Sequence, residues 1–254
     1  MGRLCAYCQK DKKLTKEHIW QKCIIKRMPE LELKFLDSRK LVTNSELVIT
    51  DVCSDCNNNK LSPLDSYFCE LYDKYFFKYI EDKSNLKFKY NYNLLLRSLL
   101  KITYNSSRTK SRINNDFTKY KDFILTGNEN REDVIVKIDI ITPSIINNKI
   151  IYPKSARCGT IKIGVKSENF ILRMISVNSY YFYMIISKEV DIKSEIIRNE
   201  FFEIFNSVPG TVIEPGKEEI ELKGFSNRDT LYIHKPHIDT NKEFYDRAIK
   251  NNKK

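Results

Sequence analysis

Four cysteines near the start of the chain form two pairs with the spacing of metal-binding knuckles. The first pair is Cys5 and Cys8, and the second pair is Cys53 and Cys56. Four thiolates in two Cys-x-x-Cys pairs satisfy the tetrahedral coordination that zinc prefers in structural sites. The sequence therefore predicts one structural zinc ion that joins two segments far apart in the chain.

The residues beside these pairs have the chemistry needed to hydrolyse a phosphate ester. Glu17 and His18 lie between the pairs, and Asn57 directly follows Cys56. A neutral imidazole can take a proton from water near neutral pH. Carboxylate and amide oxygens hold hard divalent cations, and Lys60 could neutralise a phosphate. Because adjacent residues of a strand face opposite sides, Glu17 and His18 can share a site only if the chain bends there.

Together these residues resemble the HNH, or ββα-metal, endonuclease family. The resemblance covers residues 3–66, and it is strongest for the zinc-containing branch with four cysteines. It implies that His18 is the general base, that Glu17 and Asn57 hold a catalytic Mg²⁺ or Mn²⁺, and that the cysteines bind a separate structural zinc. It also implies cleavage of DNA that leaves 5′-phosphate and 3′-hydroxyl ends, and it suggests a role in restriction or anti-phage defence.

One position departs from the family pattern. The family usually has an asparagine shortly before the second cysteine pair, where Val48 stands in this chain. Asn44 and Asp51 are the nearest polar substitutes for the role of orienting the site. Two other functions remain open: a non-catalytic, zinc-dependent nucleic-acid-binding module, and a nuclease that acts on structured RNA.

The distribution of charge favours a polyanionic partner. The chain has a net charge of +11, and residues 83–121 hold ten basic residues against the single acidic residue Asp116. Within this block, side chains that recur at helical spacing are expected to contact phosphates of double-stranded DNA. These side chains are Arg97, Lys101, Arg108 and Arg112. The alternative is a charged face that only contacts solvent.

Hydrophobic periodicity predicts the elements that position these residues. Around the cysteines we expect a strand at 14–20, a short helix at 21–28 and a strand at 47–52, followed by a helix that begins with Ser62 as its N-cap and Pro63. A second helix is expected at 92–106. Beyond residue 123, strands are expected at 134–140, 159–165, 170–187, 211–214, 219–223 and 230–234, and helices at 191–207 and 241–249.

The predicted fold class is therefore α+β, with three parts. Residues 1–82 form a zinc-stapled ββα-metal HNH module with the helix that follows it, 83–122 form a basic helical connector, and 123–254 form a mixed, mainly antiparallel α+β domain of unknown role. The sequence shows no apolar stretch long enough to span a bilayer, so we expect a cytoplasmic protein without a membrane partner. A homodimer is a further expectation.

Two groups of residues lie outside this pattern. Cys23, Cys69 and Cys158 lack a Cys-x-x-Cys partner, and we expect them to be buried, unpaired cysteines. His234 and His237 have the spacing His-x-x-His. Pro236 disfavours the helix that would bring both onto one face, so a strand end followed by a loop is favoured over a second metal site.

Overall fold

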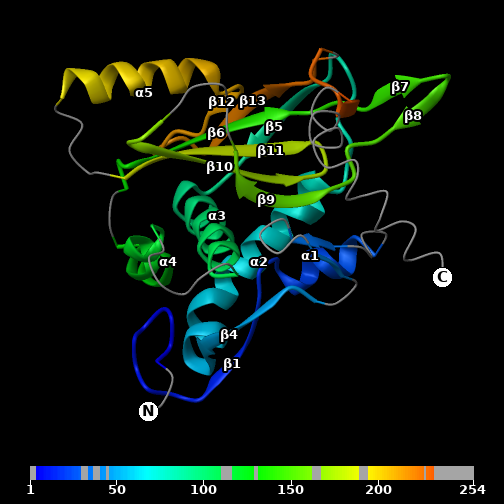
Figure 1. Ribbon diagram of the computed structural model, residues 1–254. Coiled ribbons are helices and arrows are strands. Elements are labelled where there is room, and N and C mark those ends of the chain that lie inside the picture. Colours follow the sequence, from blue (N-terminus) through cyan, green and yellow to red (C-terminus); the bar gives the residue numbers. More distant parts are fainter. Residues whose placement is uncertain are drawn as a thin grey trace.

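The computed structural model describes residues 4–29, 34–36, 41–43, 46–109, 116–128, 131–161, 167–188, 194–225 and 227–231. Figure 1 shows a sheet with helices on both faces, and a smaller strand pair at the far end of the helical layer. Strand pairing within every sheet is antiparallel. The expected α+β fold class is confirmed.

The strand pair and the helices next to it form the N-terminal end of the molecule. Strands β1 (Leu14–His18) and β4 (Val48–Cys53) pair antiparallel, as the sequence predicts. Between them come α1 (Lys22–Arg27) and the hairpin of β2 (Lys34–Leu36) with β3 (Leu41–Thr43). After β4, the chain enters a helical rod of three segments, η2 (Cys56–Leu61), α2 (Ser62–Leu71) and η3 (Tyr72–Phe76).

The start of this rod differs from the expectation that Ser62 is an N-cap. Leu61 already has helical dihedral angles, φ −91° and ψ −28°, and the chain is helical from Cys56 onward. Pro63 has no N–H to donate, and the turns before it follow the π-helical hydrogen-bonding pattern. The zinc-type cysteine pair therefore leads directly into helix, and Ser62 lies inside the rod.

Helix α3 (Tyr92–Ser107) lies at the centre of the molecule, where it packs against α2 and against β9 of the large sheet. Its start is capped by the side chain of Asn91, which accepts a hydrogen bond of 3.0 Å from the backbone N–H of Leu94. The apolar face of this helix points into the core, since Leu95, Leu99 and Ile102 are all buried. Helix α3 therefore connects the N-terminal strand pair to the sheet.

The large sheet has five strands in the order β12-β6-β11-β10-β9. Their bounds are Thr211–Val212, Val134–Ile140, Tyr180–Ser187, Phe170–Val177 and Ala156–Thr160, respectively. A short hairpin, β7 (Ser144–Ile146) with β8 (Lys149–Ile151), projects from one end of the sheet (Figure 1). Strand β13 (Glu219–Lys223) pairs with β5 (Asn85–Lys89) and so returns the chain to its N-terminal half.

Alternating residues of the large sheet face two different apolar layers. One face joins α2, α3 and the strand pair in a single core that runs from Cys5 to Leu222. The other face lies under α5 (Glu195–Ser207), where Ile204 is buried. The turn η4 (Thr118–Tyr120) and helix α4 (Lys121–Thr126) contact α3. The division into 1–82, 83–122 and 123–254 stays a prediction.

Two expectations concern the rest of the chain. Among the helices of the described residues, none is both long enough and apolar enough to cross a membrane. The histidines His234 and His237 and the helix expected at 241–249 lie outside the residues that the structure describes.

Candidate metal centre and adjoining polar hollow

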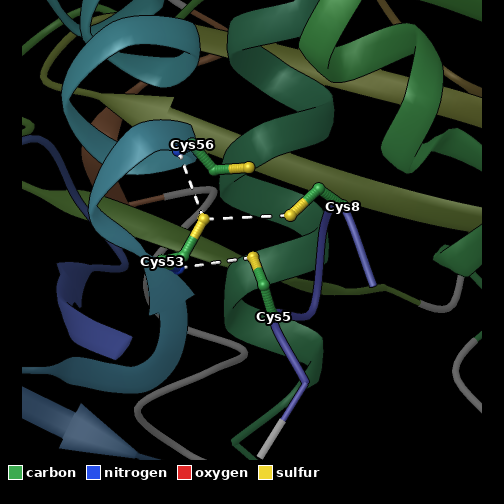
Figure 2. Close-up of side chains that lie close together, drawn as sticks. All are labelled: Cys5, Cys8, Cys53 and Cys56. Atoms are coloured by element: carbon green, nitrogen blue, oxygen red, sulfur yellow. Dashed lines mark hydrogen bonds between the residues drawn. The ribbon is translucent and has the colours of Figure 1, made fainter. Parts of the chain in front are cut away.

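The four predicted cysteine ligands meet at one point (Figure 2). Cys5 and Cys8 precede β1, Cys53 ends β4 and Cys56 begins η2. Their sulfur atoms lie within 4.8 Å of one another, and the sulfurs of Cys8 and Cys53 are 3.8 Å apart. Tetrahedral zinc with bonds of about 2.3 Å places its sulfur ligands about 3.8 Å from each other. This cluster can therefore bind a zinc ion.

The surroundings of the sulfurs act differently on the individual thiols. Backbone N–H groups of Cys53 and Cys56 donate to the sulfurs of Cys5 and Cys53, at 3.3 and 3.5 Å. Burial opposes ionisation of Cys5, but backbone N–H donors together lower its pKa to about 7. Burial raises the pKa of Cys56, and the neighbouring sulfurs of Cys53 and Cys8 raise it further. A bound cation would offset the repulsion between neighbouring thiolates and the cost of burying them, and so would stabilise all four thiolates.

A polar hollow of about 290 Å³ lies beside the cysteine cluster. It brings together Glu17, His18 and Asn57, the three residues expected to form a hydrolytic site. The strand register shifts between Thr15 and Glu17, so β1 is irregular directly before the Glu17–His18 pair. The complete lining is Lys16, Glu17, His18, Gln21, Lys22, Asn57, Asn58, Ser62 and Asp65.

The side chain of Asn57 is held in one orientation. Its amide nitrogen donates to the hydroxyl of Thr15 at 3.1 Å and to the backbone carbonyl of Lys16 at 3.0 Å. Since the nitrogen is committed to β1, the carbonyl oxygen of the amide is the atom that remains for a ligand. Cys56 is the preceding residue, so a metal in the cluster would also fix the position of Asn57.

His18 has a carboxylate partner that the sequence did not indicate. Its Nε2 lies 3.1 Å from a carboxylate oxygen of Glu46, and this contact lowers the pKa of Glu46. Of the two residues expected in the orienting role, Asn44 lies outside the described residues. Asp51 is buried and its carboxylate pairs with Arg108 at 3.3 Å, so Glu46 is the acid that contacts His18.

A second acid, Asp65 of α2, joins Glu17 through a buried lysine. The ammonium of Lys101 lies 2.6 Å from the Glu17 carboxylate and also pairs with Asp65. Asn105 donates to the same oxygen of Glu17 at 3.3 Å. Burial alone would lower the pKa of Lys101, but the two carboxylates outweigh it and raise that pKa, so the lysine stays charged.

This arrangement corrects the expected phosphate contacts. Lys101 is only 1% exposed, and Arg108 is buried against Asp51. The guanidinium of Arg97 donates to the carbonyls of Ile124 and Leu125 in α4, at 3.0 and 3.1 Å. These three cations hold α3 to its neighbours, because α3 is a central helix with contacts on several sides. Arg112 lies outside the described residues, whereas Lys60 is exposed on η2.

Replacement of Lys101 by methionine is expected to lower the free energy of unfolding by about 3–5 kcal/mol, because it leaves the buried carboxylate of Glu17 without its cation. Urea unfolding measures the change. The exposed Lys60→Met should change stability by no more than about 0.5 kcal/mol. Adding Glu17→Gln to Lys101→Met should recover part of the loss, and equal stability of Lys101→Met and the wild type would contradict the ion-pair assignment.

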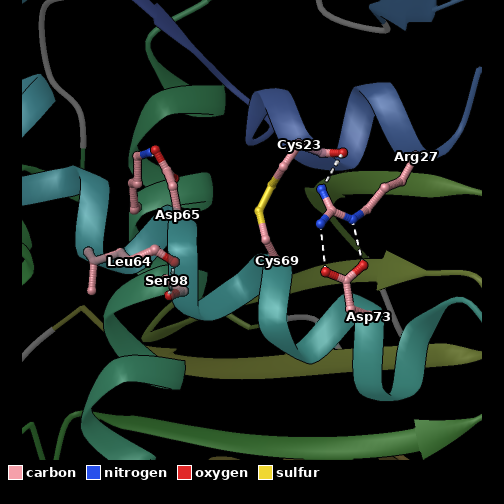
Figure 3. The surroundings of a disulfide bond; sticks show 8 residues. Cys23, Arg27, Leu64, Asp65, Cys69, Asp73 and Ser98 are labelled. Atoms are coloured by element: carbon pink, nitrogen blue, oxygen red, sulfur yellow. Dashed lines mark hydrogen bonds and ion pairs between the residues drawn. A yellow bond between two sulfur atoms is a disulfide. The ribbon is translucent and has the colours of Figure 1, made fainter.

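The expectation that Cys23 and Cys69 are unpaired is wrong. A disulfide joins them, with their Cα atoms 6.3 Å apart, and Figure 3 shows it bridging α1 and α2. One turn further along, the guanidinium of Arg27 makes two contacts of 2.6 Å with the carboxylate of Asp73 (Figure 3). These links fix α1, which begins at the wall of the hollow, against the helical rod. Cys158 is a free cysteine, as expected.

Comparisons of this chain with protein-family models, with curated proteins and with solved structures found no match. The fold and the site therefore define the class to which the chain can be assigned. It is an α+β protein with a four-cysteine cluster that can bind zinc, next to a polar hollow that contains a histidine, two asparagines and two carboxylates.

Proposed function

We propose that this chain is a metal-dependent endonuclease of the HNH, or ββα-metal, type that hydrolyses phosphodiester bonds of double-stranded DNA. The observation that carries the proposal is the meeting of Glu17, His18 and Asn57 in one hollow. They come from two segments far apart in the chain, the end of β1 and the start of η2, and the cysteine cluster lies next to them.

The local topology also supports the proposal. Two antiparallel strands, β1 and β4, are followed by a helix, and the cysteine cluster holds their junction together. In this arrangement His18 ends the first strand and Asn57 lies in the first helical turn. Nuclease activity requires a base and a cation ligand near one phosphate, and these two positions can supply both.

The donor atoms in the hollow suit a hard divalent cation such as Mg²⁺ or Mn²⁺. The carbonyl oxygen of Asn57 remains for a ligand, and one oxygen of Glu17 is held by Lys101, which leaves the other. Asp65 likewise uses one oxygen on Lys101. Oxygen donors of this kind are the ligands that such cations prefer. When bound, the cation would neutralise charge on the scissile phosphate and on the leaving 3′ oxygen.

In this proposal His18 removes a proton from the attacking water. Glu46 accepts a hydrogen bond from Nε2, which places the proton of the neutral imidazole there and leaves Nδ1 as the base. The water attacks in line with the leaving oxygen, so the products carry 5′-phosphate and 3′-hydroxyl ends. Lys60, exposed on η2, could contact a neighbouring phosphate. The expected homodimer and cytoplasmic location remain predictions.

Nicking of supercoiled plasmid across a titration of Mg²⁺ and Mn²⁺ tests the proposal. We expect cleavage by the wild type, and loss of cleavage in Asn57→Ala that high Mn²⁺ partly restores, because this change weakens cation binding. Asn59→Ala is the matched control, since Asn59 is an exposed residue of the same helical turn whose amide contacts Asp55.

Substrate choice separates the alternatives. Preferential cleavage of structured RNA in parallel assays would reassign the substrate. A wild-type protein that binds nucleic acid but cuts neither DNA nor RNA with any divalent ion would favour the non-catalytic binding module.

A further inference from the structure

A second hollow, of about 450 Å³, lies beyond the C-terminal end of α2. Four lysines line it: Lys74 comes from the end of the helical rod, Lys78 from the bend after it, and Lys87 and Lys89 from β5. No acidic side chain is among its lining residues, which also include Tyr75, Ile80, Leu86 and Tyr180. Segments from two elements therefore concentrate positive charge around one concave surface.

The lysines around this hollow are only weakly engaged within the described part of the chain. Lys87 and Lys89 share Glu219, at 3.4 and 3.6 Å, and both are well exposed. The ammonium of Lys74 lies over the ring of Tyr75, and that of Lys78 lies over Phe77, at 5.2 and 5.3 Å from the ring centroids. Exposed ion pairs contribute little to stability, so a phosphate can replace Glu219 at low cost.

The floor of the hollow is closed. Tyr75 and Tyr180 are 6% and 1% exposed, and the hydroxyl of Tyr75 accepts a 3.0 Å hydrogen bond from the backbone N–H of Lys89. A specific nucleotide pocket would need buried polar groups that converge on the ligand. This hollow instead offers flexible point charges at its rim, the recognition chemistry of a phosphate backbone.

We propose that Lys74, Lys78, Lys87 and Lys89 form a binding surface for the phosphodiester backbone of nucleic acid. The surface replaces the contacts expected from Lys101 and Arg108, which are buried, and from Arg97, whose half-buried guanidinium donates to backbone carbonyls. It extends the proposed nuclease function, because it would bind the backbone of the substrate at a distance from the cleavage site. Binding at this surface does not depend on cleavage.

The two hollows lie on one helical rod. Asp65 lines the first hollow and Lys74 lines the second, and the rod between them rises about 14 Å. Figure 1 shows α2 leading from the end of β4 toward the large sheet.

Fluorescence anisotropy with a labelled duplex of about 20 base pairs tests this surface, in buffer without added divalent ions so that no cleavage occurs. The variant is Lys74→Gln with Lys78→Gln. The matched control is Lys149→Gln with Lys154→Gln, which removes two exposed lysines from the region of β8 and gives the same net charge. Thermal unfolding of both variants verifies that each is folded.

Counterion release makes the logarithm of the binding constant fall with the logarithm of salt concentration, by about 0.9 for each phosphate contact. The Lys74/Lys78 variant should therefore lose about 1.8 from the magnitude of this slope and bind on the order of tenfold more weakly, whereas the control keeps the wild-type slope. Equal salt-dependence slopes for the two variants would overturn the proposal of this surface. Displacement of the duplex by a mononucleotide at equal phosphate concentration would also overturn it, in favour of a nucleotide site.

The outcomes separate this surface from the nuclease proposal. If the wild type never cuts, but the Lys74/Lys78 variant loses salt-dependent binding, the surface proposal stands and the nuclease proposal fails. If the Lys74/Lys78 variant binds and cuts like the wild type, the surface proposal fails and the nuclease proposal stands.

Discussion

Replacement of Cys53 by serine is expected to remove the zinc ion and to destabilise the N-terminal half of the protein. Cys53 lies where β4 ends, and its backbone N–H also supports the sulfur of Cys5. A structural zinc site contributes its binding free energy to folding, about 10–16 kcal/mol in zinc-finger peptides. The loss should extend beyond the cluster, because Cys5, Cys53 and Cys56 belong to the main apolar core.

Metal analysis of the purified protein should find about one zinc per wild-type chain and almost none in Cys53→Ser. Thermal unfolding of the same samples gives the loss of stability. Cys158→Ser is the control, because it removes a free thiol of β9 that lies outside the cluster. Its zinc content should match the wild type. Retention of one zinc with wild-type stability in Cys53→Ser would contradict the four-cysteine assignment.

Replacement of His18 by alanine is expected to slow cleavage by about 10²- to 10⁴-fold, the usual cost of losing a general base. His18 is not a cysteine-cluster ligand, and its ring is half-buried at the wall of the hollow. The variant should therefore keep its zinc, its fold and its affinity for nucleic acid. A smaller loss, about 10- to 100-fold, is expected for Glu46→Gln, because Glu46 only orients the imidazole.

Rates of plasmid nicking under single-turnover conditions, measured with binding in parallel, distinguish these effects. The order of rates should be wild type, then Glu46→Gln, then His18→Ala. If a folded His18→Ala protein cut at the wild-type rate, the assignment of His18 as the base would be abandoned. A weaker effect of His18→Ala than of Glu46→Gln would show that Glu46 has a role of its own.

Local patterns in the sequence were sufficient to predict the four-cysteine cluster and several elements. Cysteine spacing indicates a site that can bind a metal, because each Cys-x-x-Cys pair is one local turn, and the four sulfurs converge as expected. Strand and helix periodicity placed β1, β4, α3 and β6 within a few residues, because the order of apolar and polar residues follows the period of each element. The fold class followed from the order of these elements.

Only the tertiary structure decided which charged side chains are internal. Helical spacing gives Arg97 and Lys101 of α3, and Arg108 directly after it, related directions, but it does not say whether solvent or other elements lie there. The structure surrounds them with acceptors from α4, β1, α2 and β4. A basic side chain buried against acids stabilises packing instead of binding phosphate, because its charge is already compensated.

Sequence spacing likewise does not identify the residues that contact Glu17 and His18 in the candidate site. Asp65 reaches Glu17 through Lys101 of a third element, and Glu46 reaches His18 across a separation of 28 residues. Cys23 and Cys69 meet because α1 packs on α2. The sequence by itself determined the residues whose chemistry depends on local spacing. The partners of those residues depend on packing between distant segments, so the tertiary structure alone decided them.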